Sequence, residues 1–240
     1  MLELPYCPHC GYEIPENAIH CPHCGERISG PNTRSRPSSE RVGAGEHLSI
    51  AFNIASEKPI VFAPVIISGL ISVIIDNIWG ESFQYGLSPF LLFAGLISLI
   101  GSIVNYILNF ASIDMSRDAY MDEPLDLRES IYYVISRIGT FIVASIVGAI
   151  MAITIILIPV VIIMFVIIVM DETGIGDAIS KSFKVISSDL GDIILILIVA
   201  IIGSIIISFV PYISGLLHAC LNVVVGISFI DVYYNYKRGF

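Results

Sequence analysis

Residues 139–170 form an uninterrupted apolar run, and this run constrains the fold of the chain more than any other feature. It contains no charged residue and one proline, Pro159. A helix crosses a bilayer with about 20 residues, so the run is too long for one crossing and short for two. The path of this segment therefore decides on which side of a membrane the following residues lie.

Other apolar runs and the composition of the chain are typical of a membrane protein. Residues 193–210 also lack any charge, 55% of the 240 residues are hydrophobic, and 14% are charged. Soluble domains carry roughly 25% charged residues. We therefore predict an all-α polytopic membrane protein with a small polar head, in preference to a buried soluble helix bundle.

Four of the five cysteines stand in two copies of the motif CPHCG near the N-terminus. The first copy holds Cys7 and Cys10, and the second holds Cys21 and Cys24. Each C-x-x-C turn places two thiolates side by side, and four thiolates complete a tetrahedral zinc site with no open position for a substrate. The motifs predict a structural Zn²⁺ ion bound by these four cysteines.

The segment resembles the zinc-ribbon modules found at the ends of many archaeal and bacterial proteins, over about residues 5–28. A rubredoxin-like iron site is the alternative, although rubredoxins separate their two motifs more widely. His9, His20 and His23 lie beside the cysteines as possible replacement ligands. We expect these histidines to be exposed, because four thiolates already close the site.

The charge of the zinc ribbon indicates which kind of partner it binds. It is acidic, and the whole chain has a net charge of -9. Nucleic-acid binding depends on Lys and Arg that neutralise phosphates, so we expect no nucleic-acid partner. We predict that the ribbon docks a protein partner in the cytoplasm.

The predicted domains are a zinc ribbon at 1–28, a flexible linker at 29–45 rich in Pro, Gly, Ser and Arg, and a helical transmembrane domain at 46–240. Apolar stripes at helical spacing predict interfacial helices that begin at Glu46, Asp126 and Ile175, and the first stripe comprises Leu48, Ala51, Phe52 and Ala55. Each helix leads into a two-helix hairpin embedded among membrane lipids, and the second span of the first hairpin is expected at about residues 89–113. Trp79 is predicted to anchor the end of the first span at the interface.

Two patterns predict a turn at Pro159. A weak repeat of 52 residues matches Ser130, Gly139 and Pro159 with Ser182, Gly191 and Pro211. Pro211 interrupts an apolar stretch too long for one crossing, so it is expected to lie in a turn. Six crossings also place all 12 Lys and Arg residues on one side, in accord with the positive-inside rule.

We therefore predict six transmembrane helices in three hairpins, in the cell membrane, with both termini in the cytoplasm. Five crossings are the alternative, because residues 159–170 rise only about 18 Å as a helix, against about 30 Å of hydrocarbon.

The phrase DAISKSFK at residues 177–184, together with the hairpin layout of 46–240, resembles the membrane domain of glycerophosphodiester phosphodiesterases and related families. In those proteins an acidic residue, a small apolar residue and a Ser precede the final hairpin. The resemblance implies a fold and not an activity, because no phosphodiesterase catalytic domain accompanies it in this sequence.

Small and polar residues inside the spans predict helix packing. They form three stripes: Gly101, Asn105 and Asn109; Ala94, Ser98 and Ser102; and Ala144, Gly148 and Ala152. In the last span His218, Asn222 and Asp231 form the candidate functional group, because polar residues there are costly unless paired. Asp231 is also close enough to Lys237 to be interfacial.

The sequence shows no catalytic constellation, so we expect no enzyme, and Cys220 is expected to be a packing residue. The leading hypothesis is a scaffold or accessory protein whose zinc ribbon docks a cytoplasmic partner. The alternative is a lipid- or small-solute-handling permease with a regulatory ribbon.

Overall fold

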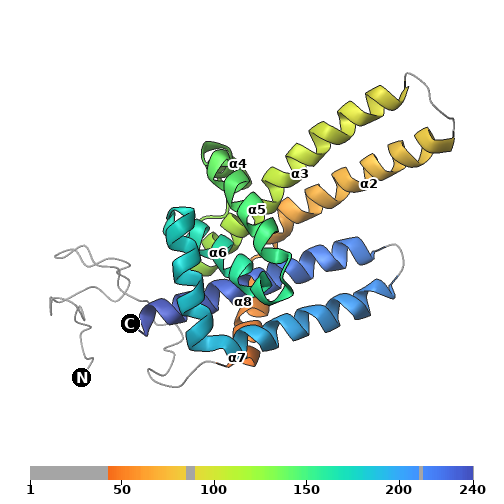
Figure 1. Cartoon of the computed structure of the whole chain (residues 1–240). Coiled ribbons are helices and arrows are strands. Elements are labelled where there is room, and N and C mark those ends of the chain that lie inside the picture. Colours follow the sequence, from red (N-terminus) through yellow and green to blue (C-terminus); the bar gives the residue numbers. More distant parts are fainter. Residues whose placement is uncertain (1–42, 85–89, 211–212, 240) are drawn as a thin grey trace, which may run out of the picture. The chain divides into compact units, whose positions relative to one another are not determined.

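The structure, a computed structural model, describes residues 43–84, 90–210 and 213–239. These ranges belong to one compact unit, Val42–Phe240, and they form helices without any strand (Figure 1). The predicted zinc ligands Cys7, Cys10, Cys21 and Cys24, most of the predicted linker, the side chain of Trp79 and the turn at Pro211 lie outside the described residues.

Helices account for nearly all of the described chain, which confirms the all-α class. In order they are α1 (Ala44–Glu57), η1 (Pro59–Phe62), α2 (Ala63–Gln84), α3 (Phe90–Met121), α4 (Leu127–Ser136), α5 (Ile138–Ala152), η2 (Ile155–Leu157), α6 (Ile158–Asp171), α7 (Ile175–Ser208) and α8 (Ser214–Arg238). Three consecutive pairs pack together, α2 with α3, α5 with α6, and α7 with α8.

Three of these helices are long and apolar enough to cross a membrane: Phe93–Met121 in α3, Ile175–Ser208 and Ser214–Arg238. The number rises to five when α1 with α2, bent by 96°, and α4 with α5, bent by 75°, each count as one span. α5 and α6 have only 15 and 14 residues, about 22 Å of helix each. The chain is therefore a membrane protein with three to five candidate spans.

One residue ahead of each hairpin has a non-helical backbone conformation. Lys58, Arg137 and Asp189 leave the helical conformation, with φ and ψ of -123° and 66°, -115° and 18°, and -132° and 39°. Arg137 and Asp189 are 52 positions apart, which is the spacing of the predicted repeat. Ser130 and Ser182, which the repeat also matches, are both buried.

The chain reverses between α5 and α6, just before Pro159 rather than at it. Residues 153–157 contain the reversal, and Pro159 lies in the first turn of α6. Proline suits that position because its missing N–H has no intrahelical acceptor there. Gly148 packs against the return helix, where an added Cβ would lie 3.0 Å from Val161 Cγ1. The predicted packing stripe thus holds for Ala144 and Gly148, whereas Ala152 is exposed.

Two helices differ from the predictions, α3 in where it ends and α1 in which face is buried. α3 was expected to end near residue 113, but it continues to Met121, because Met115 and Ala119 on its inner face are buried in the core. In α1, Ala51 and Ala55 are buried as expected, but Phe52 is exposed. The buried face of α1 instead runs through Ala44 and His47.

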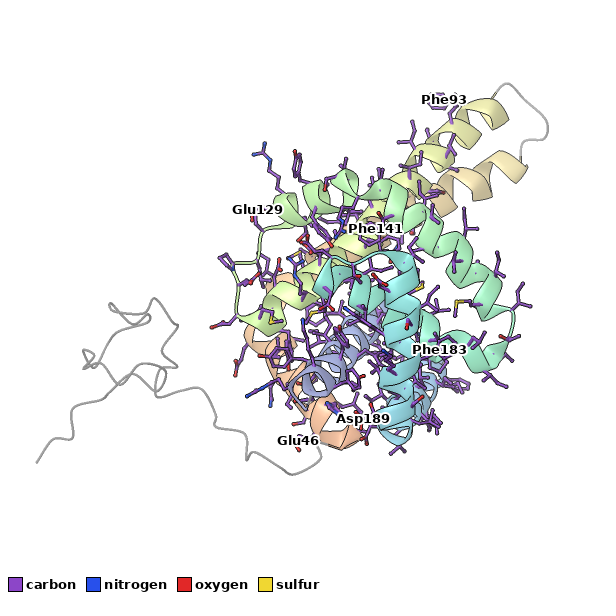
Figure 2. The ribbon with its side chains drawn as sticks, turned by 60° about the vertical axis from the view of Figure 1, so that its left-hand side comes forward. Glu46, Phe93, Glu129, Phe141, Phe183 and Asp189 are labelled. Carbon is purple, nitrogen blue, oxygen red and sulfur yellow. The ribbon has the colours of Figure 1, made fainter. Side chains whose placement is uncertain are left out.

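The core surrounds α6 and the C-terminal halves of α3 and α8. Ile163, Met164, Ile167 and Ile168 of α6 are fully buried and pack with Phe141 of α5 and Phe229 of α8. Phe93, by contrast, lies on the projecting end of the α2/α3 pair, away from Glu46 and Glu129 (Figure 2). Phe93 thus lies away from the apolar core of this helical unit.

Candidate functional site

Asp231 lies at the centre of a buried network that joins three helices. Its Oδ2 is 2.5 Å from Nδ1 of His47 on α1, and its Oδ1 accepts a hydrogen bond of 2.5 Å from the Tyr120 hydroxyl on α3. Asp231 is 0% exposed and His47 is 3% exposed. A buried carboxylate is very costly without such partners, so this network fixes the mutual placement of α1, α3 and α8.

Small side chains explain how His47 reaches Asp231. Ala44, Ala51 and Ala55 share its face of α1 at helical spacing and let α1 lie close against α8. Tyr120 comes from the last turn of α3, in the extension that the sequence was not expected to form. His47 and Tyr120 were not among the predicted site residues.

A second cluster lies around Arg117. Its guanidinium is 2.9 Å from Asp114 and 2.7 Å from Asp118, and it stacks over the ring of Tyr133 on α4 at 5.4 Å. It also donates a hydrogen bond of 3.3 Å to the Val169 carbonyl on α6. The cluster therefore ties α4 and α6 to α3.

A third cluster is centred on Asp171, the last residue of α6 and outside the candidate spans. Its Oδ2 accepts hydrogen bonds of 2.6 Å from both Lys181 on α7 and the Tyr233 hydroxyl on α8, and its Oδ1 accepts one of 2.8 Å from Lys237. Burial opposes ionisation, but the hydrogen bonds from Lys181, Lys237 and Tyr233 outweigh it and lower the pKa of Asp171 to about 2.

These three clusters, centred on Asp231, Arg117 and Asp171, are called the polar layer below. Asp192 of α7 adds a link by accepting a hydrogen bond of 2.8 Å from the Ala44 backbone N–H at the start of α1. Chemically, the acids of the polar layer face cations, a tyrosine or a histidine. Within the described ranges no group of three His, Cys, Asp or Glu side chains is arranged to hold a metal ion.

The structure separates the predicted group of His218, Asn222 and Asp231. His218 and Asp231 are 13 positions apart on α8, about 20 Å of helix. His218 is 3.4 Å from the Ser208 hydroxyl beside the α7/α8 turn. Only Asp231 belongs to the polar layer. These three candidate residues therefore lie at different levels along α8 and do not meet in one site.

Asn222 instead lines a cleft of about 390 Å³ between α2, α3, α6 and α8. The polar residues of its wall are Ser68, Ser72, Asn109, Ser112 and Asn222. Asn105, beside the cleft, accepts a hydrogen bond of 3.1 Å from Ser68 and donates one of 3.1 Å to Ser72. These hydrogen bonds join α3 to α2, in accord with the packing predicted for Asn105. Asn109 was predicted to pack, but it is exposed at the cleft.

Comparison with known proteins identifies one segment of the chain. The zinc-ribbon domain family matches residues 6–28, which contain both CPHCG motifs. No curated protein and no solved structure matches the chain significantly. The match identifies a zinc-binding module attached to a helical membrane domain. It does not extend to the membrane domain, so the comparisons do not show the likeness of 46–240 to phosphodiesterase membrane domains.

Proposed function

We propose that the chain is a membrane-anchored docking protein, in which the helical domain is a fixed support and the zinc ribbon binds a protein partner in the cytoplasm. The polar layer is the observation that carries this proposal. Asp114, Asp118 and Asp231 are buried, and each lies within 3 Å of a partner side chain. Such pairs are costly to break, so they favour a rigid anchor over a pathway that opens and closes.

The ribbon supplies the docking module in this proposal. We assign Cys7, Cys10, Cys21 and Cys24 as the ligands of one Zn²⁺ ion, because two C-x-x-C motifs provide the four soft donors that tetrahedral zinc requires. Bound zinc would supply folding free energy to a module too short to bury a core of its own. Its surface, rather than an open coordination position, would meet the partner.

The proposed topology places both termini and the polar layer at the cytoplasmic face. Two hairpins, α2/α3 and α7/α8, cross the membrane, and the α5/α6 hairpin re-enters from the cytoplasmic side, in place of the six crossings expected from the sequence. A re-entrant hairpin leaves the sidedness of later segments unchanged. The basic residues Lys58, Arg137, Lys181 and Lys237 support this orientation, because each pairs with an acid near the ends of these hairpins.

The test of docking is a pull-down from native membranes in mild detergent, analysed by mass spectrometry. The full-length chain is compared with a Cys7→Ser, Cys21→Ser variant, and Cys220→Ser is the matched control because it removes a cysteine outside the ribbon. We expect at least one protein to be captured by the native chain and by the control, and lost with the ribbon variant. Identical protein profiles for all three chains would overturn the docking function.

A second candidate function is the lipid- or small-solute-handling permease. The observation that favours it is the cleft, which brings five polar side chains together between helices of the membrane domain. A transporter requires this cleft to become accessible from both sides, so Asn109→Leu and Asn222→Leu would abolish flux in reconstituted vesicles while leaving partner capture intact.

A further inference from the structure

The cleft contains hydrogen-bonding groups that the protein itself does not use. Asn222 is exposed, and its amide makes no hydrogen bond to the part of the chain that the structure describes. The Asn109 amide donates only to the Asn105 carbonyl of its own helix, at 2.8 Å. In hydrocarbon an unsatisfied amide costs several kcal/mol, so both groups need a partner from outside the chain.

The depth of the cleft limits what that partner is. Asn109 precedes Asp114 of the polar layer by five residues, about 8 Å of helix, and Asn222 precedes Asp231 by nine residues, about 14 Å. The cleft thus lies inside the leaflet beneath the polar layer and above the midplane of a hydrocarbon core about 30 Å thick. This is the depth of lipid ester groups and the first part of the acyl chains, where bulk water is scarce.

The chemistry of the wall excludes a charged group. Its residues include no Asp, Glu, Lys, Arg or His, and its apolar side is formed by side chains such as Phe165 and Ile113. An ionised phosphate at this depth would remain unpaired at a large cost. Two primary amides instead provide both N–H donors and carbonyl acceptors, which match hydroxyl and ester groups.

We propose that the cleft binds an uncharged glycerolipid with a free hydroxyl, of the diacylglycerol class. The amides of Asn109 and Asn222 bond its hydroxyl and ester carbonyls, and an acyl chain lies against Phe165. The volume of about 390 Å³ falls within the range of about 300–1,000 Å³ typical of small-molecule sites. This inference rests on the second candidate function for its biological use and is independent of docking by the ribbon.

The test uses the full-length protein in phosphatidylcholine nanodiscs and a diacylglycerol that carries a photoactivatable diazirine in one acyl chain. Labelled peptides are identified by mass spectrometry. We expect labelling on α3 and α6 at the cleft. Asn109→Leu and Asn222→Leu should each reduce labelling about fivefold, the equivalent of one net hydrogen bond, and the double variant should reduce it further.

His218→Leu is the matched control, since it removes a polar side chain from α8 outside the cleft wall and should label as the native chain does. Ala219→Phe provides a second variant that fills the cleft and keeps both amides, and it should also lose labelling. Thermal unfolding in detergent verifies that each variant folds. Because the readout is binding, labelling of a native chain that shows no flux in reconstituted vesicles would reject transport and retain the site.

Three results would overturn the proposal. Equal labelling of the native chain and the double variant would show that the amides do not bind the lipid. Equal labelling by a phosphatidylglycerol with the same diazirine chain would show that an uncharged head group is not required. Displacement of the probe by millimolar free glycerol would show that the ligand is a soluble polyol and not a lipid.

Discussion

The α5/α6 and α7/α8 hairpins are built from the same parts in the same order, but they differ in length. Each follows an amphipathic helix, and each begins beyond a non-helical residue, Arg137 or Asp189. The return helix α6 has 14 residues, whereas α8 has 25. Figure 1 shows α7 and α8 extending well beyond α5 and α6.

The Asp171 cluster joins the C-terminal ends of α6 and α8, so the lengths of these two helices can be compared from that contact. Asp171 ends α6 and bonds Tyr233 and Lys237 of α8, so the two helices finish side by side. From that level α6 reaches back 13 residues to Ile158, about 20 Å, and α8 reaches back 23 residues to Ser214, about 35 Å. Only α8 is long enough for a hydrocarbon core of about 30 Å.

The tip of the short hairpin has the composition of a segment inside the bilayer. Ile153, Ile155 and Ile156 are 80%, 80% and 86% exposed, and the tip carries no charged residue. At the other tip Phe209 is 82% exposed, and aromatic side chains are enriched where helices reach the interface. Similar sequence patterns thus precede two hairpins of different length, and the length of the return helix is the basis on which we propose that one crosses the membrane and the other re-enters it.

The most decisive test of this comparison is chemical access to the two tips. We expect Gly215→Cys, in a Cys220→Ser background, to react with a membrane-impermeant maleimide on intact cells, because no atom crowds that position and the proposed topology places the tip outside the cell. Thr154→Cys should react only after detergent treatment. Labelling of Thr154→Cys on intact cells would favour the six-crossing topology over the re-entrant hairpin. Failure of both variants to react would reject the proposed orientation.

The next largest effect is the loss of stability expected when Asp231, the buried acid that links α8 to α1 and α3, is replaced. Asp231→Ala removes the carboxylate that the buried His47 ring and the part-buried Tyr120 hydroxyl contact, and breaking a buried pair costs about 3–5 kcal/mol. The measurement is the free energy of unfolding in detergent, with His218→Ala as the control on the same helix. A cost for Asp231→Ala no larger than the control would show that the network does not hold α8 in place.

Local patterns allowed much of this architecture to be predicted. Helices were expected to begin at Glu46, Asp126 and Ile175, and they begin at Ala44, Leu127 and Ile175, because apolar periodicity reports which face of a helix is buried. The ribbon was identified for a similar reason, since its motif is local.

The polar layer could not be predicted in the same way. His47 and Asp231 are 184 residues apart, and nothing in either neighbourhood identifies the other as a partner. The extension of α3 was missed because residues 114–121 are polar in sequence, while the structure buries their inner face against other helices. Long-range pairing thus decides where the polar residues of this chain lie.

A smaller effect on stability is expected at Asp171, which joins the ends of α6 and α8. Asp171→Asn weakens three contacts in a partly exposed site, so we expect a loss of about 1–2 kcal/mol. The pKa of Asp171, about 2, is below the usual unfolded value of about 4, so its stabilising contribution is present above about pH 4 and is lost as the pH falls toward 2. Unfolding measured from pH 5 to pH 2 should therefore decline less steeply in Asp171→Asn than in the native chain. Parallel curves would show that Asp171 does not link the two hairpins.

The smallest effects on stability are expected when one glycine in each hairpin, Gly148 or Gly203, is replaced by alanine. A Cβ at Gly148 would lie 3.0 Å from Val161 Cγ1, and one at Gly203 would lie 3.2 Å from Leu221 Cδ2. Alanine gains up to about 1 kcal/mol over glycine within a helix, but the stiff β-branched valine cannot move aside, whereas the end of a leucine side chain can. Gly148→Ala should therefore lower the free energy of unfolding by about 1 kcal/mol, and Gly203→Ala should raise it by a few tenths. Val161→Ala should remove the penalty of Gly148→Ala, and if it does not, the contact between α5 and α6 is looser than the structure indicates.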